Sequence, residues 1–233
     1  MADRGAVVVI GGTSGIGREV AKRYADAGRR VILSGRDEGR AAATAAELGG
    51  DTAGVAVDLS VPETIAPALA DIGAVDYLVI AAIERDANKI REFDFARATR
   101  LVTLKLVGYA EVVHALHDRF HERSAVVLFG GLAMVRPYIG STTVTTVNGG
   151  VSSMIRTLAL ELAPVRFNTL HPGIVGDTPT WAGNDAKLAE VLARTPTGRL
   201  VKTEDIVGAT AFLLENEAVN GINLEVDGGW MLM

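Results

Sequence analysis

A glycine-rich stretch near the start of the chain has the residue types of a phosphate-binding turn. It reads Gly11-Gly12-Thr13-Ser14-Gly15-Ile16-Gly17, after an apolar run at residues 6–10 and before a segment of helical periodicity. Glycines there allow a tight turn and let the N–H groups of a helix N-terminus approach a pyrophosphate. Glycine-rich loops also occur for turn geometry alone, but a position between strand and helix predicts a dinucleotide site. The candidate cofactor-binding residues of this turn are Gly11, Thr13, Ser14, Gly15, Ile16 and Gly17.

The end of the second expected strand indicates which dinucleotide would bind. An NAD site places Asp or Glu there, about 20 residues after the glycines, on the ribose 2′-hydroxyl. This chain has Ser34-Gly35-Arg36 instead. A guanidinium can hold a 2′-phosphate and no carboxylate repels it, so Ser34 and Arg36 favour NADP(H); a solvated arginine is the alternative. Asp58 and Leu59 follow the third expected strand, where they would meet the adenine, although Asp58 also suits a simple helix entry.

Further motifs, in the same order along nearly the whole chain, resemble those of the short-chain dehydrogenase/reductase family. They are the glycine turn, Asp58-Leu59, the run from Glu161 to Asn168, His171-Pro172-Gly173, Gly221 and Val226-Asp227-Gly228-Gly229. The resemblance implies a Rossmann-type domain, a nicotinamide cofactor and a homo-oligomer (dimer or tetramer), which we expect to pack through the long helices at residues 97–121 and 142–162. It also implies further cofactor-binding residues, namely Ala81, Ala82, Pro172, Gly173, Ile174, Val175 and, beyond an intervening Asp177, Thr178.

The catalytic positions of that family carry other residues in this chain. The family uses a serine, a tyrosine and a lysine four residues apart on one helix, and an asparagine on a neighbouring helix. Hydride transfer to a carbonyl needs such a proton donor and hydrogen-bond support. The corresponding residues here are Gly131, Val144, Asn148 and Lys105. Asn and Lys have exchanged places, so we expect Lys105 to supply the missing charge, holding the nicotinamide ribose or a water, and also to count as cofactor-binding. A surface lysine with a solvated head is the alternative.

Other polar residues compete for the role of the missing acid. Tyr138, in the loop after Gly131, could present a phenol to substrate, so the candidate catalytic residues are Lys105, Asn148 and Tyr138. Arg136 in the same loop could bind a substrate carboxylate or serve only solubility. His171 could act as an acid, but a satisfied histidine at a strand end is the simpler interpretation.

Two further groups of side chains have less specific patterns. Ser141, Thr142, Thr143 and Thr145 would either line the emptied pocket or cap the following helix. His114, His117 and His121 fall on one expected helix, but no acidic or cysteine partner completes a set of ligands there. No metal is therefore expected.

Short runs of β-branched residues alternate along the chain with segments of helical periodicity. These strands and helices must position the candidate site residues. Expected strands lie at residues 6–10, 30–34, 55–57, 77–80, 125–129, 166–170 and 223–226, and expected helices at 15–27, 37–48, 62–72, 97–121, 142–162 and 203–214. Ser60 to Glu63 has the pattern of a capping box with proline in the first turn. This alternation predicts an α/β fold, a doubly wound parallel sheet of about seven strands with helices on both faces in three layers. We expect one domain over residues 1–233, with a small lid inserted at about 177–197.

Composition narrows the function classes. The chain has 233 residues and contains 26 glycines. Its hydrophobic fraction of 48% is too high for an intrinsically disordered protein. A net charge of −5 argues against a nucleic-acid partner, and the absence of cysteine excludes disulfides, thiolate zinc sites and a cysteine nucleophile. The first apolar run is too short for a signal peptide, and the uncharged stretch at 137–155 is rich in Thr, Ser, Gly and Asn, so we expect protein interior, no membrane partner and a cytoplasmic location.

Three functions fit these residues. The first is an NADP(H)-dependent oxidoreductase acting on a small organic substrate that needs little acid help, such as an iminium ion or an activated olefin. The second is a catalytically silent NADP(H)-binding sensor or subunit. The third is a cofactor-bound scaffold for a non-redox isomerisation or cyclisation. The fold does not separate them, because function depends on the site.

Overall fold

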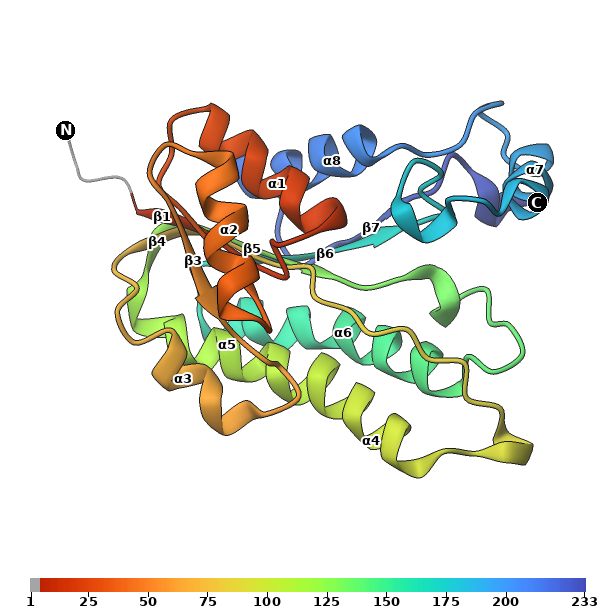
Figure 1. The fold of residues 1–233 in the computed structure, drawn as a ribbon, viewed down its shortest axis with the longest axis horizontal. Helices are drawn as coiled ribbons and strands as arrows, with labels where there is room; N and C mark the ends of the chain where they lie inside the picture. The colour runs from red at the N-terminus through yellow and green to blue at the C-terminus, as the bar shows by residue number, and fades with distance from the viewer. Residues whose placement is uncertain (1–4) are drawn as a thin grey trace.

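A computed structural model describes residues 5–233 and shows one parallel sheet between two layers of helices (Figure 1). The strands are β1 (Ala6–Ile10), β2 (Val31–Gly35), β3 (Thr52–Ala56), β4 (Val75–Ile80), β5 (Phe120–Phe129), β6 (Arg166–Pro172) and β7 (Asn223–Val226). Their order is β3-β2-β1-β4-β5-β6-β7, and every neighbouring pair is parallel. The expected doubly wound Rossmann-type sheet of seven strands is confirmed.

The helices divide between the two faces of the sheet. On one face lie α1 (Gly15–Asp26), α2 (Glu38–Leu48) and α8 (Thr203–Glu215). On the other lie α3 (Ile65–Ala68), α4 (Phe95–Val102), α5 (Gly108–Leu116) and α6 (Thr142–Glu161). The short helix α7 (Asp185–Ala193) lies near the C-terminus, beyond the end of the sheet (Figure 1).

The alternation of side chains along β1 explains why both faces are covered. Val7 and Val9 belong to the apolar cluster that includes residues of α1, α2 and α8, whereas Val8 and Ile10 belong to the cluster formed with α3, α5 and α6. All four side chains are essentially inaccessible to water. Burial on both faces favours continuous apolar runs and leaves no polar face to expose. A ligand would therefore bind at the loops beyond the ends of the strands rather than on a face of the sheet.

The expected helix at 97–121 is divided into several parts. It begins earlier as α4, passes through a π-helical turn at Thr103–Val107, continues as α5 and ends in a 3₁₀ turn at His117–Arg119. β5 then begins at Phe120, so His121 lies on a strand. The π turn lies just before the point where the helix packs on the loop after β3, since a Cβ on Gly108 would collide with the backbone of Leu59. Wide turns of this kind are frequent at functional sites, and this one carries Lys105.

Other element boundaries also differ from expectation. The expected helix at 62–72 is a 3₁₀ turn at Pro62–Thr64 followed by the single turn of α3. Its capping box is wrong: Val61 is the N-cap, and the Ser60 hydroxyl donates to Asp58 Oδ1 at 2.6 Å. β3 ends at Ala56 and begins at Thr52, three residues before the expected start, and β2 is one residue later than expected.

Two segments that the sequence singled out have defined structures. The segment 177–197 contains a 3₁₀ turn at Pro179–Trp181 and α7. The uncharged stretch at 137–155 is a short loop and the first part of α6, whose Val147, Val151 and Ile155 are buried. Within residues 5–233, no helix is long and apolar enough to cross a membrane.

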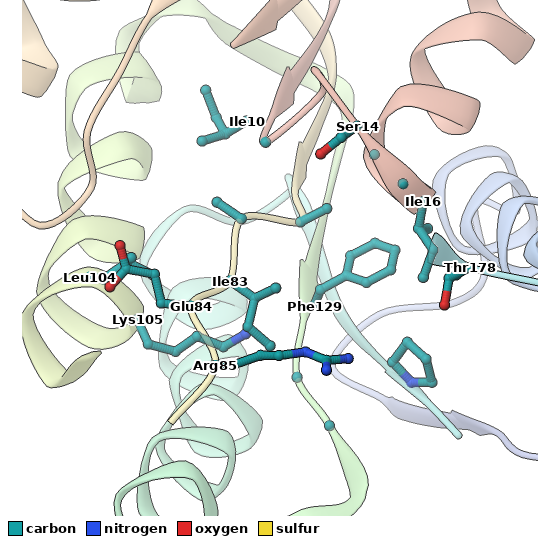
Figure 2. A pocket seen from close by; sticks show the side chains of 18 of the residues that line it. Ile10, Ser14, Ile16, Ile83, Glu84, Arg85, Leu104, Lys105, Phe129 and Thr178 are labelled. Atoms are coloured by element: carbon teal, nitrogen blue, oxygen red, sulfur yellow. The ribbon is translucent and has the colours of Figure 1, made fainter. Parts of the chain in front are cut away.

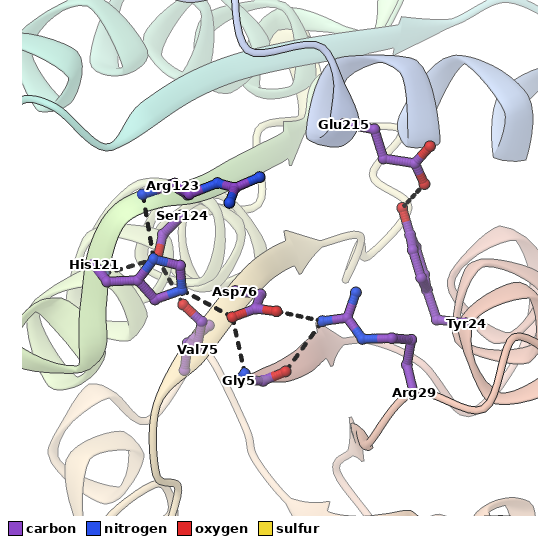
Figure 3. A network of polar contacts seen from close by, with 9 residues as sticks. All are labelled: Gly5, Tyr24, Arg29, Val75, Asp76, His121, Arg123, Ser124 and Glu215. Carbon is purple, nitrogen blue, oxygen red and sulfur yellow. Dashed lines mark hydrogen bonds and ion pairs between the residues drawn. The ribbon is translucent and has the colours of Figure 1, made fainter. Parts of the chain in front are cut away.

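A polar network ties the elements together at the amino end of the sheet (Figure 3). Asp76 accepts hydrogen bonds from the Gly5 amide at 2.9 Å and from Arg29, and its Oδ1 lies 2.8 Å from His121 Nε2. Nearby, the Tyr24 hydroxyl donates to Glu215 at 3.0 Å, which joins α1 to α8. These contacts lie at the amino ends of the strands, opposite their carboxyl ends, and stabilise the sheet and the helices packed on it.

Candidate functional site

A cavity of about 580 Å³ lies along the carboxyl ends of β1 to β6 (Figure 2). Each of these strands contributes lining residues at or just beyond its last position, from Gly11 after β1 to Pro172 at the end of β6. The order of strands reverses between β1 and β4, so the loops after these strands diverge and leave a crevice. Ligands of open α/β sheets bind in this place.

The glycine turn forms one end of the cavity. Gly11 has a φ of 84°, and a Cβ there would lie 2.6 Å from the Ala82 amide nitrogen, so only glycine fits. Gly17 packs so closely on the Gly11 carbonyl that a Cβ would collide with it. Gly15, by contrast, has a φ of 53° and open space in front of it, and the Ser14 side chain does not cap α1. The first-turn N–H groups of α1 are thus left for an anionic ligand.

Charged side chains gather beside the ends of β2, β3 and β4. Arg36 donates to Glu84 at 2.7 Å, and Arg100 donates two bonds to the same carboxylate at 2.7 and 2.9 Å. Arg100 also lies 3.6 Å from Asp58. Arg40 lines the same end of the cavity. Arg36 and Arg40 therefore line this part of the cavity, and β2 contributes no carboxylate to it. Glu84, from the loop after β4, pairs with Arg36.

The structure places nearly all of the predicted residues on one cavity wall. Those that line it are Gly11, Thr13, Ser14, Gly15, Ile16, Gly17, Arg36, Asp58, Leu59, Ala81, Ala82, Lys105, Asn148, Pro172, Gly173, Ile174, Val175 and Thr178. Ser34 is not among them. It is 1% exposed and its hydroxyl accepts a hydrogen bond from the Gly11 amide at 3.3 Å, so it supports the turn from behind.

Lys105 is the most unusual group of the site. Its side chain points into the cavity from the π turn (Figure 2), is 1% exposed, and its Nζ has no hydrogen-bond partner among residues 5–233. The ammonium lies 5.0 Å from the centre of the Tyr109 ring. Burial lowers the pKa of Lys105 from 10.5 to about 7, because a desolvated amine favours its neutral form. A solvated surface lysine is thereby excluded, and the unpaired amine is suited to a polar ligand.

Gly131, Asn148 and Val144, which we expected at the serine, lysine and tyrosine positions of the family, all line the cavity. Gly131 and Asn148 pack closely against each other, because a Cβ on Gly131 would lie 2.8 Å from Asn148 Nδ2. Asn148 is 3% exposed and lies on α6, one helical turn after Val144. This wall offers a carboxamide but no hydroxyl or phenol at these three positions.

His171 supports that wall from behind. It is fully buried on β6, and its Nδ1 accepts a hydrogen bond from the Gly131 amide at 2.9 Å. The proton must then be on Nε2, which lies 3.0 Å from Asn223 Oδ1. Burial lowers the pKa of His171, the nearby charge of Lys105 adds to this, and the hydrogen bond that the ring donates to Asn223 opposes it only in part. The neutral ring is fully paired and does not line the cavity, which agrees with the satisfied strand-end histidine rather than with an acid.

Two loop residues proposed for the substrate lie elsewhere. Tyr138 is 56% exposed and is not part of the cavity wall. Arg136 donates to the carbonyl oxygens of Trp230 at 2.9 Å and Met233 at 3.1 Å, and its guanidinium stacks 4.3 Å from the Trp230 ring centre. Arg136 thus holds the C-terminal segment against the loop, and it does not face the cavity.

The remaining polar groups have local partners. His117 Nδ1 lies 2.6 Å from the His114 carbonyl, and His121 lies on β5 and contacts Asp76 (Figure 3), so the three histidines do not share a helix. The part of the chain that the structure describes contains no group of three metal-ligating side chains. The Thr145 hydroxyl donates to the Ala133 carbonyl at 3.0 Å and lies 3.0 Å from the Ser141 hydroxyl; neither lines the cavity. Thr142 and Thr143 do not line it either.

Several lining residues were missed by the sequence analysis. Arg40, Ile83, Glu84, Arg85, Leu104 and Phe129 also border the cavity. Arg85 lies 5.7 Å from the ring centre of Trp181, which brings the loop after β4 to the segment 177–197. The sequence could have indicated Ile83, Glu84 and Arg85 as site residues, because they follow β4 and the loops after parallel strands border the ligand crevice. Arg40 is one turn into α2 and has no comparable signal.

Comparisons with known proteins agree with this geometry. A family model described as Enoyl-(Acyl carrier protein) reductase matches residues 10–231. Carbonyl reductase family member 4 of Danio rerio is 33% identical over 97% of this chain and 98% of its own length. The 3-oxoacyl-(acyl-carrier-protein) reductase FabG of Escherichia coli is 30% identical over 97% of each chain.

Solved structures show the same relationship. A short-chain dehydrogenase/reductase of Brucella melitensis, described as a glucose/ribitol dehydrogenase, superposes with a TM-score of 0.88 at 30% identity, covering 97% of this chain and 96% of its own. The MalC reductase/Diels-Alderase of Malbranchea aurantiaca has the same TM-score at 23% identity and shares the fold. The chain, with its glycine turn and cavity at the switch point of the sheet, belongs to the short-chain dehydrogenase/reductase family of oxidoreductases.

Proposed function

We propose that this protein is an NADP(H)-dependent oxidoreductase that transfers hydride between the nicotinamide and a small organic substrate, in a site without the usual serine and tyrosine. The observation that carries the proposal is the single cavity wall that joins the open glycine turn and Arg36 at one end to the unpaired amine of Lys105 at the other. Both ends have groups that a phosphorylated dinucleotide would satisfy.

The residues present fit this cofactor from end to end. The pyrophosphate would lie against Gly15 and the first turn of α1, where there is open space and unpaired N–H groups. Asp58 and Leu59 would border the adenine, Ala81 and Ala82 the middle of the cofactor, and Pro172 to Val175 with Thr178 the nicotinamide. When bound, NADPH supplies the hydride.

Arg36 is the residue that would select NADP(H). Its side chain is 58% exposed, and its bond to Glu84 is a surface ion pair of the kind that contributes about 0–1 kcal/mol. A dianionic phosphate is a stronger partner for a guanidinium, so the ligand would displace Glu84. Arg40 lies on the same end of the cavity and would add a second positive charge.

Lys105 and Asn148 are the groups that would support chemistry at the nicotinamide end. A positive charge at Lys105 would hold the ribose or a water, and the Asn148 amide can donate a hydrogen bond to a substrate oxygen. Carbonyl compounds, imines and activated olefins are all candidate substrates. Iminium ions need no proton after hydride addition and make the smallest demand on a wall without a phenol.

Segment 177–197 would act as a lid over the cavity of the single domain 1–233. Trp181 of this segment and Arg85 both line the cavity and would lie at its entrance.

Exposed apolar side chains on the helices support a homo-oligomer. Phe95 on α4 is 76% exposed and Val107, just before α5, is 50% exposed. A homodimer or homotetramer packed through α4, α5 and α6 would cover these apolar side chains.

Gly131 and Val144 on the cavity wall also favour a second candidate, a silent NADP(H)-binding protein or a scaffold for a non-redox step. The test is a fluorescence titration with NADPH and NADH, followed by NADPH consumption with panels of ketones, imines and enones. The proposal expects NADPH to bind more tightly than NADH and at least one panel to be reduced. Tight binding without consumption on any panel would contradict the oxidoreductase and support the second candidate.

A further inference from the structure

A carbonyl reduction in this cavity would need a proton donor, and the lining residues narrow the choice. The titratable side chains on the wall are Arg36, Arg40, Asp58, Glu84, Arg85 and Lys105. Arginine keeps its proton at any physiological pH, which excludes three of these groups as donors. The oxygens of Glu84 are occupied, because they accept hydrogen bonds from Arg36 and Arg100.

Asp58 and Tyr109 are excluded for different reasons. Burial acts to raise the pKa of Asp58, but hydrogen bonds from Ser60 and the charge of Arg100 outweigh it, so this pKa is lowered and the group stays ionised. Burial raises the pKa of Tyr109, and its hydroxyl donates to the Ala82 carbonyl at 2.8 Å instead of facing the cavity. Lys105 is the group that remains.

The position of Lys105 suits proton transfer. It lines the cavity together with Leu104, Gly131 and Asn148, and its amine has no hydrogen-bond partner within residues 5–233 to hold the proton back. Burial gives this amine a pKa of about 7, so both protonation states are populated near neutral pH. Its flexible four-carbon stem lets the amine reach a group bound in the cavity.

We propose that Lys105 is the catalytic proton donor for carbonyl reduction, an inference that rests on the proposed function. As hydride arrives at the carbonyl carbon, the C=O π bond breaks, a C–H bond forms, and the ammonium of Lys105 gives its proton to the oxygen. The products are an alcohol, the oxidised cofactor and a neutral amine, which regains a proton from water. In the reverse direction the neutral amine accepts the proton of the alcohol.

The first test measures the protonation of Lys105 without turnover. The chain has five lysines, Lys22, Lys89, Lys105, Lys187 and Lys202, so Cε-labelled lysine gives a simple ¹³C NMR spectrum in the presence of NADP⁺. One signal, absent in Lys105→Arg, should titrate with a midpoint near 7. A Lys105 signal with a midpoint at the model-peptide value of about 10.4 would overturn the proposal.

The second test compares a ketone with an iminium ion of similar size. Lys105→Met should lower kcat/KM for the ketone by about 10²–10⁴-fold, and for the iminium ion, which needs no proton, by less than tenfold. Lys187→Met is the matched surface control and should change neither. For the wild type, kcat/KM for the ketone should fall above pH 7, about tenfold per pH unit.

Each contrary outcome of the second test has a distinct meaning. Undiminished ketone reduction by Lys105→Met contradicts the donor and leaves the proposed function intact. Equal losses with both substrates also contradict it, because they indicate a role in binding or folding. If the wild type reduces neither substrate, the proposed function fails and the donor fails with it.

Discussion

Asn148 occupies the space that a side chain at position 131 would need: a Cβ on Gly131 would lie 2.8 Å from Asn148 Nδ2. The two positions are therefore coupled, because the absence of a side chain at Gly131 leaves the space that Asn148 fills in the wall of the cavity. This coupling explains how glycine at position 131 and asparagine at position 148 occur together in a well-packed site.

Gly131→Ser should accordingly cost stability only while Asn148 is present. The backbone at Gly131 is extended, so the cost comes from displacing the buried amide and should be about 1 kcal/mol. Asn148→Ala should remove most of this cost in the double variant, as urea unfolding would measure. Gly149→Ala is the control: nothing lies within 4 Å of its Cβ, and a helical alanine should stabilise α6 by about 0.5–1 kcal/mol. Additive effects of the two site variants would contradict the coupling.

His171→Gln should destabilise the protein in a pH-dependent manner. The buried neutral ring pairs with the Gly131 amide and Asn223, so its replacement should cost about 1–3 kcal/mol at pH 7.5. Because the pKa of His171 is lowered in the folded state, the unfolded chain binds more protons on acidification. The contribution of His171 is thus fully present above pH 6.5 and is lost as the pH falls below it.

Unfolding free energies of wild type and His171→Gln at pH 5 to 8 would show the difference narrowing at acidic pH. The exposed His117→Gln serves as the control for replacing a histidine at the surface. A constant difference across this range would show that the native ring is not held neutral.

Arg36→Leu should weaken NADPH binding without weakening NADH binding. Loss of a charge-assisted contact to the 2′-phosphate is expected to cost about 1.5–3 kcal/mol, or roughly 10–100-fold in Kd. Fluorescence titration with both cofactors measures the ratio. Arg123→Leu, on an exposed arginine at the opposite end of the sheet, should not change it. Equal losses for NADPH and NADH would contradict the assignment of Arg36 to the phosphate.

Lys105→Met should make the cofactor-free protein more stable at neutral pH, because it removes an unpaired buried amine. The pKa of Lys105 is lowered from 10.5 to about 7, so between these values the unfolded chain holds more protons than the native state. Native wild type should therefore gain stability relative to Lys105→Met as pH rises from 7 to 10, by at most about 1.4 kcal/mol per pH unit. Urea unfolding at pH 7 and 9 measures this change.

The affinity for NADPH tests whether Lys105 also contacts the cofactor. Lys105→Ala should weaken NADPH binding severalfold if the amine contacts the nicotinamide ribose, whereas Lys202→Ala, on an exposed lysine, should not. Unchanged affinity would restrict Lys105 to the substrate side of the cavity.

The cofactor end of the site could be predicted from local patterns. Glycine at positions 11, 15 and 17 and the apolar run before them report backbone geometry that neighbouring residues determine, so motif and structure agree. Strand boundaries and the capping box at Ser60 were less accurate, because Ser60 turns its hydroxyl to Asp58 rather than to the helix. Hydrogen bonds between such close polar groups compete, and their outcome depends on packing beyond the motif.

The catalytic end shows the limit of the sequence. By itself, the sequence predicted that the usual hydroxyl and phenol are absent and that Lys105 and Asn148 stand in exchanged positions. Only the tertiary structure decided that the Lys105 amine is buried without a partner on the cavity wall, that Tyr138 lies outside it, and that His171 is fully paired behind it. Residue type and spacing specify which groups are near one another along a helix or strand, whereas desolvation and pairing arise from segments far apart in the chain, and these set the protonation of Lys105 and His171.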